Sequence, residues 1–309
     1  AMACIEEFEE IVRRYLDAPL LSDAGSYAPK PGENVVVAIF MNASQYYDSC
    51  GELYRLRGQS ARVIVYLFDC WHDDFFVPKA LPALRAALGK TIAWHDCVDH
   101  LCLPLPEAVT RAKHAGGEVQ LVPYGVDTSR SDGLNENRPL EIFAYGRQPA
   151  DVLSLLSARL NAPDANGFLY HTNHIGGAFL TDTEQHRRMF WALAQKSRIA
   201  LAYDVAQAAM GSGLEHSAVT QRWYECTAAG CVIAGTRPTT PEADRLLPWE
   251  DSTIELPLEP EAACEALFDL LGDTDRLRNI SRRNAIEARR RHDWRHRLRE
   301  ILLEAGLDV

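Results

Sequence analysis

The stretch from Thr220 to Thr236, TQRWYECTAAGCVIAGT, places an arginine and a glutamate three residues apart, ahead of an apolar run. On a helix, Arg222 and Glu225 would share one face. The planar guanidinium of an arginine matches the oxygens of a diphosphate, and a glutamate one turn later can accept hydrogen bonds from two ribose hydroxyls. The residues alone leave a second interpretation open, which is an exposed ion pair worth about 0.3–0.5 kcal/mol.

The segment that leads into this helix supports the first interpretation. An apolar run at 199–203 predicts a buried strand, and a loop containing Gly211 and Gly213 follows it. Open parallel sheets bind ligands outside the carboxyl ends of their strands, and glycines let the backbone approach a ligand closely. The N-terminus of the next helix favours an anion. A binding site here would include Gly213, Arg222, Glu225 and Thr227, and the residues alone leave it and the exposed ion pair equally open.

The first half of the chain carries acids and histidines that could act on a hydroxyl. LFDCWHDDFF (67–76) and WHDCVDH (94–100) supply Asp69, His72 and His95. A carboxylate or an imidazole in such a place can orient a hydroxyl or take its proton. The alternative is that these side chains cap helices or hydrogen-bond within loops. Their spacing fixes no metal geometry, so we predict no metal site.

The elements that would position these residues alternate between helix and strand. Helical patterns at 5–17, 44–58, 82–90 and 105–117 are interspersed with apolar strands at 35–41 and 61–69, and a third strand is expected near 91–96. After a polar stretch at 128–139, which we take as a linker, a second series of strands and helices follows. Short apolar strands that alternate with helices predict an α/β fold, in which parallel sheets are covered on both faces.

Composition excludes several classes of function. The net charge of −11 argues against a nucleic-acid partner, which needs a basic face. No apolar run is long enough to span a membrane, and no signal-peptide pattern is present, so we expect a cytoplasmic protein with its eight cysteines reduced. The ten arginines between Arg276 and Arg299 are either a solvated helix face or a contact for an anionic acceptor or lipid headgroups.

The segment RWYECTAAGCVIAGT resembles the donor-site signature of GT-B glycosyltransferases in the group-1 (family 4-like) clan. Three segments resemble the same clan in the same order: LVPYGVD (121–127), IFAYGR (142–147) and KSRIALAYD (196–204). The tail RRRHDWRHRLREIL (289–302) also agrees. The arginine three residues before the glutamate is similar to the spore-maturation-type branch of that clan.

The resemblance implies two Rossmann-like domains that face a cleft. These would be a short acceptor domain at 1–130, a donor domain at 138–285 and a terminal helix at 286–309 that packs back on the first domain. The implied activity is transfer of a sugar from a nucleotide-diphosphate sugar, with UDP favoured, to an acceptor hydroxyl without a metal. Glu225 would hold the ribose, and Gly146 and Arg147 would approach the diphosphate. Asp69 is in register with an aspartate that ends the corresponding strand in relatives.

One position departs from the family pattern. Many members carry a glutamate eight residues before Glu225, facing the donor sugar, and this chain has Ser217 there. Two alternatives therefore stay open beside the transferase: an epimerase or hydrolase acting on the nucleotide sugar, and a non-catalytic subunit that binds a nucleotide sugar or serves as a scaffold. The acceptor could be a glycan, a lipid-linked sugar or a small molecule.

Overall fold

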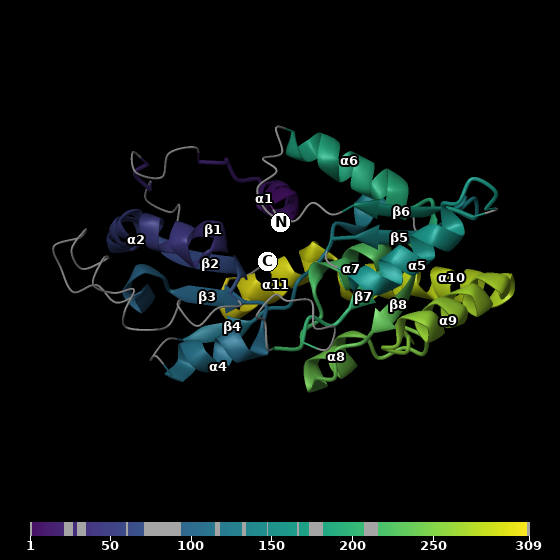
Figure 1. Cartoon of the computed structure of the whole chain (residues 1–309). Coiled ribbons are helices and arrows are strands. Elements are labelled where there is room, and N and C mark those ends of the chain that lie inside the picture. The colour runs from purple at the N-terminus through teal and green to yellow at the C-terminus, as the bar shows by residue number, and fades with distance from the viewer. Residues whose placement is uncertain are drawn as a thin grey trace. The chain divides into compact units, whose positions relative to one another are not determined.

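A computed structural model of the chain describes residues 2–21, 27–29, 35–59, 61–70, 94–114, 118–131, 134–146, 148–165, 167–172, 182–206 and 216–307. The chain divides into two compact units (Figure 1). Unit 1 comprises Ala1–Tyr124 and Trp294–Val309, and unit 2 comprises Gly125–Asp293. The sequence analysis placed the two domain boundaries at 130–138 and at 285–286. In the structure the first boundary comes earlier, after Tyr124, and the second comes later, after Asp293.

Unit 1 contains a parallel sheet with the strand order β1-β2-β3-β4. Its strands are β1 (Val35–Asn42), β2 (Arg62–Asp69), β3 (His100–Leu103) and β4 (Val119–Leu121), and its helices are α1 (Met2–Tyr15), α2 (Ala43–Gly58), α4 (Pro106–His114) and α11 (Trp294–Glu304). The middle six residues of β2 are all buried, as expected for an inner strand covered on both faces. The apolar run VIVYLF therefore forms the centre of this unit.

The third strand lies later in the chain than the sequence suggested. Trp94–Cys97 forms a 3-10 helix (η2), and β3 begins at His100, which pairs with Ile64 of β2. The expected strand near 91–96 is therefore wrong for the residues from 94 onward, and 91–93 lie outside the described residues. A strand of only four residues carries little pattern of its own. The mixed polar and apolar residues before β3 were therefore mistaken for the strand.

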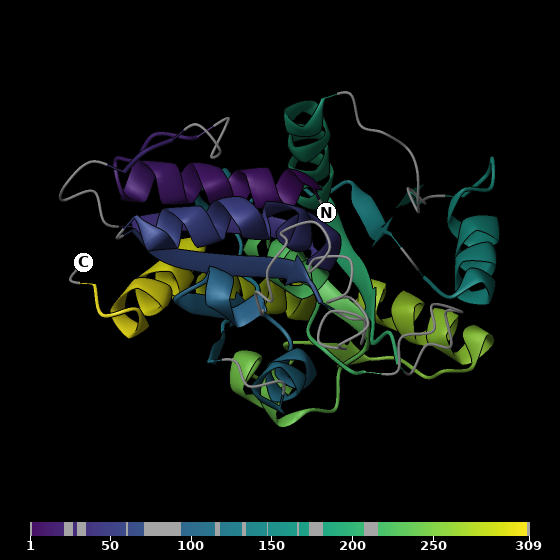
Figure 2. The same cartoon turned by 90° about the vertical axis from the view of Figure 1, so that its left-hand side faces the viewer.

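Both ends of the chain complete the core of unit 1. Figure 2 shows the terminal helices, α1 in purple and α11 in yellow, beside the strands of this unit. The ring of Phe8 stacks on that of Trp294 with centroids 4.2 Å apart, and Tyr66 of β2 meets both rings edge-on. The last helix thus packs back on the N-terminal unit, as the resemblance implied.

Unit 2 contains a second parallel sheet, with the order β6-β5-β7-β8-β9. Its strands are β5 (Leu140–Tyr145), β6 (Leu169–Thr172), β7 (Ser197–Tyr203), β8 (Val232–Thr236) and β9 (Ile254–Glu255). Its helices are α5 (Ala150–Leu160), α6 (Thr183–Ala194), α7 (Gln221–Ala228), α8 (Pro241–Leu246), α9 (Pro260–Gly272) and α10 (Thr274–Arg291), and a 3-10 helix, η3, spans Thr128–Arg130. The predicted linker at 128–139 thus belongs to this unit.

Alternate residues of the unit 2 strands face two different helical layers. Ile142, Ile199 and Val232 pack with residues of α5 and α9 in one buried cluster. Phe143, one residue along β5, instead contacts Phe190 of α6 on the other face. The period of two along each strand therefore explains why both faces of this sheet are apolar.

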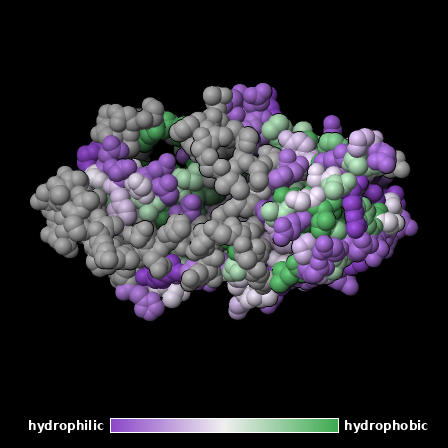
Figure 3. Space-filling model, viewed as in Figure 1, coloured by the Kyte–Doolittle hydropathy of each residue, from purple (hydrophilic) through white to green (hydrophobic). Residues whose placement is uncertain are grey.

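The surface of unit 2 mixes the two kinds of residue. On the face shown in Figure 3, hydrophilic and apolar residues are interspersed over the described part of this unit. The large apolar side chains that are exposed, such as Phe168, Met189 and Leu258, come from separate elements. Of the helices in the described part of the chain, none is both long and apolar enough to cross a membrane.

Candidate functional site

The strand order of unit 2 creates one point where the chain reverses its direction across the sheet. From β5 the chain passes through α5 to β6 on one side, and then through α6 to β7 on the other side of β5. In open parallel sheets, ligands bind at such a switch point, in the crevice outside the carboxyl ends of the two strands. Here Gly146 follows β5 and Asp204 follows β7, so these two residues mark the carboxyl ends of the strands at the switch point.

Gly146 brings the backbone into close contact with an arginine of α7. Its φ is +72°, in the left-handed region that favours glycine. A Cβ atom at this position would lie 2.7 Å from Nη2 of Arg222. A side chain here would be strained by the positive φ and would push the guanidinium of Arg222 aside. The structure thus joins two predicted site residues, Gly146 and Arg222, at the switch point.

Glu225 lies in a buried ion pair with an arginine that the sequence analysis did not single out. Its Oε1 accepts a hydrogen bond from Nη1 of Arg187 on α6 at 2.6 Å. Both residues are almost fully buried, with 2% of Glu225 and 3% of Arg187 exposed. The guanidinium of Arg187 also lies 5.1 Å from the ring centroid of Phe190. This geometry excludes the interpretation of Glu225 as half of an exposed ion pair.

Thr227 does not face a ligand site. It is fully buried, and its hydroxyl donates to the backbone carbonyls of Trp223 at 2.5 Å and Tyr224 at 3.1 Å in its own helix. Such bonds to the preceding turn are the usual outcome for a threonine inside a helix. This arrangement argues against the predicted contact of Thr227 with a donor.

Gln148 is a site residue that sequence reasoning missed. Its side-chain nitrogen donates to the carbonyls of Tyr145, at the end of β5, and Leu201 of β7, both at 3.1 Å. Because both partners are acceptors, the nitrogen must face them, which fixes the orientation of the amide. Its Oε1 is buried and has no hydrogen-bond partner among the described residues. A buried acceptor without a partner is unusual, and this one points to a donor that the described residues do not supply.

Asp204 and Ser217 form the other wall of the crevice. The backbone N–H of Asp204 bonds to both the carbonyl and the hydroxyl of Thr236 at 2.9 Å, and its side chain is fully buried. The hydroxyl of Ser217 donates to Oδ2 of Asp204. At the position where many relatives carry a glutamate, this chain therefore presents a half-buried serine with a carboxylate behind it.

The predicted catalytic residues do not come together. Asp69 is the last residue of β2, in register with Asn42 at the carboxyl end of the unit 1 sheet. His95 belongs to η2, which precedes β3, so it lies near the opposite edge. An eight-residue strand spans about 26 Å, which separates the two edges. Three predicted site residues, His72, Arg147 and Gly213, lie outside the described residues.

The cysteines form no disulfide, and two of them are poor nucleophiles. Burial raises the pKa of the Cys70 and Cys102 thiols, which keeps both protonated at neutral pH. A reactive or metal-binding cysteine needs the thiolate form. Within the described ranges, no group of three or more His, Cys, Asp or Glu side chains has an arrangement that could hold a metal ion.

The arginines of α10 are mostly paired within unit 2. Their partners are acids on the same helix or on the loop before β9: Arg276 with Asp251, Arg278 with Asp275, Arg283 with Glu250, and Arg291 with Glu287. These ion pairs are consistent with a solvated helix face, in which much of the local charge is balanced. Arg282 is an exception, since no acid among the described residues pairs with it.

Comparison with known proteins supports the architecture. Residues 161–303, just under half of the chain, match the model of the glycosyl transferase-like family. No curated protein matches the chain. Two structures of Anabaena HepE, with UDP-glucose and with UDP, are similar at TM-scores of 0.55 and 0.54 and 11% identity. The first covers 87% of this chain and 78% of HepE, and the second covers 97% and 81%.

A third similar structure is that of TarM, with a TM-score of 0.52 and 7% identity over 98% of this chain and 57% of TarM. These likenesses show the fold. Each unit is a Rossmann-like α/β domain built on a parallel sheet, and the last helix of the chain returns to the first domain. Residues 161–303 therefore match the glycosyl transferase-like family, and the chain as a whole has the GT-B fold.

Proposed function

We propose that the protein is a glycosyltransferase that binds a nucleotide-diphosphate sugar in unit 2 and transfers the sugar to an acceptor hydroxyl. The observation that carries the proposal is the approach of Arg222 to the left-handed Gly146 turn at the switch point of the sheet. A guanidinium held against bare backbone there suits the negative charge of a diphosphate. The family match over 161–303 and the UDP and UDP-glucose bound by HepE support the same assignment.

The charge on Arg222 gives the site a means of stabilising the leaving group. As the bond between the sugar and the diphosphate breaks, negative charge develops on the departing oxygen. A fixed cation at that oxygen lowers the barrier without a metal ion, so we propose that transfer is metal-independent. The Oε1 of Gln148, which accepts no hydrogen bond from the described residues, offers an acceptor to an N–H or O–H of the same ligand.

The ion pair with Arg187 fixes the orientation of the Glu225 carboxylate. Arg187 fixes one carboxylate oxygen at 2.6 Å. We propose that Glu225 binds the ribose hydroxyls in this fixed orientation. Ser217, with Asp204 behind it, would then face the donor sugar in place of the glutamate found in many relatives.

Asp69 is our proposed base or orienting group for the acceptor hydroxyl. It is exposed at the carboxyl end of β2, where a parallel sheet presents its ligands. The Asp69→Asn variant should lose sugar transfer while it keeps its affinity for the nucleotide. If turnover is unchanged, the acceptor hydroxyl is activated elsewhere.

The proposal is tested by the thermal stabilisation that nucleoside diphosphates provide. UDP, GDP, dTDP, CDP and ADP are each added to the wild type, with and without Mg²⁺. A ligand at a hundred times its dissociation constant stabilises by about 2.7 kcal/mol. We expect UDP to stabilise the protein without metal, and Arg222→Ala to lose most of that effect.

A matched arginine variant separates the site from a general loss of charge. Arg188→Ala on α6 removes an exposed arginine that pairs only at the surface with Glu184, so it should leave the response to UDP unchanged. If none of the five nucleotides stabilises the wild type, the transferase proposal fails, and a scaffold role without nucleotide would take its place. If UDP binds but no acceptor or water takes the sugar, the chain is a non-catalytic binder.

A further inference from the structure

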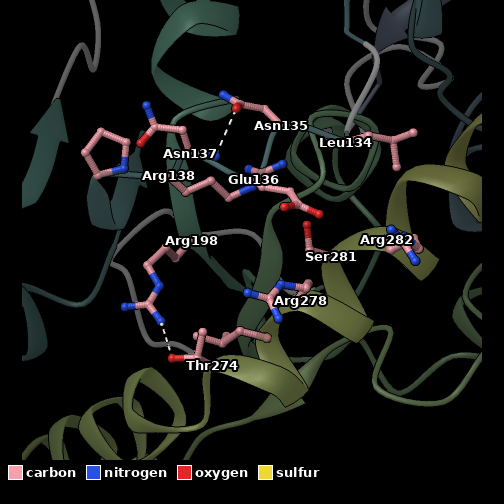
Figure 4. A pocket seen from close by; sticks show the side chains of 12 residues that line it. Leu134, Asn135, Glu136, Asn137, Arg138, Arg198, Thr274, Arg278, Ser281 and Arg282 are labelled. Carbon is pink, nitrogen blue, oxygen red and sulfur yellow. Dashed lines mark hydrogen bonds between the residues drawn. The ribbon is translucent and has the colours of Figure 1, made fainter.

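A hollow lies at the opposite edge of the unit 2 sheet from the switch point. It has a volume of about 340 Å³ and is formed by the segment 134–139, the first residues of β7 and one side of α10 (Figure 4). Leu140 and Ser197, where β5 and β7 begin, mark this as the amino-terminal edge. The donor site proposed above lies at the carboxyl ends of the same strands, so the two sites are separate.

The hollow is basic in an acidic protein. Four arginines line it against a single carboxylate, that of Glu136, while the chain as a whole carries a net charge of −11. The arginines come from three parts of the fold: Arg138 from the segment before β5, Arg198 from β7, and Arg278 and Arg282 from α10. Cations gathered from separate elements around one concave space favour an anion.

Two of these guanidinium groups are held in place by backbone carbonyls. Arg138 donates to the carbonyl of Ser197 at 2.7 Å and to that of Ala229 at 2.9 Å. Arg198 donates through Nη2 to the carbonyl of Leu271 at 3.2 Å and to the hydroxyl of Thr274 at 3.3 Å. These hydrogen bonds hold both guanidinium groups in fixed positions, and the acceptors of Arg198 are neutral, so Arg198 keeps its full charge. Preorganised donors lose little conformational entropy when a ligand binds.

The α10 side of the hollow adds two exposed cations. Arg278 shares its charge with Asp275 at 3.2 Å, near the rim. Arg282 is exposed, and no acid within the described part of the chain pairs with it. The neighbouring arginines of α10 have such partners, so Arg282 has a charge available for a ligand.

The rest of the lining is polar and suited to hydroxyl groups. Asn135, Asn137, Ser281 and the carboxylate of Glu136 surround the basic centre (Figure 4). The Asn135 amide is already bonded to the Gln195 carbonyl and the Asn137 N–H, and the Ser281 hydroxyl donates to the Gly230 carbonyl, which leaves Glu136 and the Asn137 side chain for a ligand. Carboxylate and amide oxygens accept hydrogen bonds from sugar or polyol hydroxyls. Apolar contact is limited to Leu134, Leu277 and Pro139.

We propose that this hollow binds the phosphate ester of a polyhydroxylated compound. The phosphate contacts Arg198 and Arg282, and the hydroxyl groups contact Glu136 and the Asn137 side chain. The same chemistry is presented by a soluble sugar phosphate and by the phosphodiester headgroup of a glycerol lipid. The site is independent of the proposed transfer reaction, since none of its lining residues belongs to the donor site.

The test is titration calorimetry of the full chain with glucose 6-phosphate, with inorganic phosphate and with glucose, each in the presence of excess UDP to occupy the donor site. We expect glucose 6-phosphate to bind more tightly than phosphate, and glucose alone to bind least. Arg282→Gln should weaken binding of the phosphate ester about tenfold, the usual cost of one charged hydrogen bond. Arg198→Gln should have at least the same effect.

Arg283→Gln is the matched control. It removes the same charge from the next residue of α10, but Arg283 faces Glu250 outside the hollow, so binding should be unchanged. A parallel sedimentation with phosphatidylglycerol and phosphatidylcholine vesicles distinguishes the two sources. Binding to phosphatidylglycerol alone that is lost in Arg282→Gln identifies a lipid headgroup, and binding to the soluble ester identifies a metabolite.

Three outcomes would overturn the proposal. One is that neither the soluble probes nor the vesicles bind. A second is that binding is equally weakened by Arg282→Gln and Arg283→Gln, which would indicate a diffuse charge effect. The third is that UDP displaces the sugar phosphate completely, which would place it in the donor site. The proposed transferase could still bind UDP in each of these cases, so the two proposals fail separately.

Discussion

Replacing Glu225 by alanine would leave Arg187 charged and buried without its partner. The guanidinium of Arg187 would then lie 5.1 Å from the ring centroid of Phe190 and 5.5 Å from that of Trp191, with only 3% of Arg187 exposed. Removing one member of a buried ion pair costs about 3–5 kcal/mol, because the remaining charge has lost its compensation. Since a domain is stable by only about 5–15 kcal/mol, this is a large fraction of the total.

The cost can be measured by urea denaturation and by the midpoint of thermal unfolding. For a domain of this size, each kcal/mol lowers the midpoint by about 2–4 °C, so Glu225→Ala should lower it by about 6–20 °C. Glu225→Gln keeps an acceptor for the arginine and should cost less. The double variant Arg187→Met/Glu225→Leu removes both charges and should recover most of the loss.

A comparison with an exposed pair tests the reasoning. Arg188 and Glu184, four residues apart on α6, form an ion pair at 3.1 Å in which 76% of the arginine side chain is exposed. Arg188→Ala should cost only about 0.3–0.5 kcal/mol. If Glu225→Ala costs no more than this, or if the double variant is as unstable as the sum of the two single variants, the pair is not a buried, coupled ion pair.

Three further outcomes follow from separate parts of the chain. Gly146→Ala forces a side chain into the left-handed region, at a cost of about 1–2 kcal/mol, and against Arg222, so calorimetry should show weaker UDP binding as well as lower stability. An unchanged affinity for UDP would mean that binding does not depend on the close approach of Arg222 to residue 146. Hydrogen bonds from Arg13 lower the pKa of Glu10 from 4.5 to about 2. The contribution of this pair to the free energy of unfolding is therefore present above pH 4.5 and is lost as the pH falls toward 2. NMR titration of the Glu10 carboxylate should show this midpoint, and a value near 4.5 would contradict the pairing. Trp294→Ala should destabilise unit 1 by about 3–5 kcal/mol in urea, since the ring is fully buried, and a loss below 1 kcal/mol would show that α11 is dispensable.

Much of the fold was predictable because its strands are apolar and its helices periodic. The apolar runs at 35–41, 61–69 and 199–203 indicated buried parallel strands, and the structure has β1, β2 and β7 there. The short elements were the ones that failed. Neither α8 nor β9 was predicted, and β3 was placed too early, since elements of two to six residues carry too little pattern.

The site was only partly readable from the sequence for a different reason. Arg222 and Glu225 were recognised because they lie within one local motif. Arg187 and Gln148 come from elements distant in sequence, and only the packing of α6 and the strand order bring them to the switch point. His95 was expected to follow the third strand, at the carboxyl edge of the sheet. It precedes β3 instead, and in a parallel sheet a residue before a strand lies at the amino-terminal edge.

Because unit 1 is built from two separate parts of the chain, it cannot be completed early during synthesis on the ribosome. Unit 2 is a single stretch whose two ends meet, since Val126 pairs with Asp293 and Thr128 bonds to the Asp293 carboxylate. Unit 2 can therefore fold as soon as it has emerged, whereas the first 124 residues lack Trp294, the ring on which Phe8 stacks. At about 5–20 residues per second, the 169 residues of unit 2 delay that ring by roughly 10–30 s. For that time the N-terminal half presents an incomplete apolar core, which makes it the part of the nascent chain most in need of a chaperone.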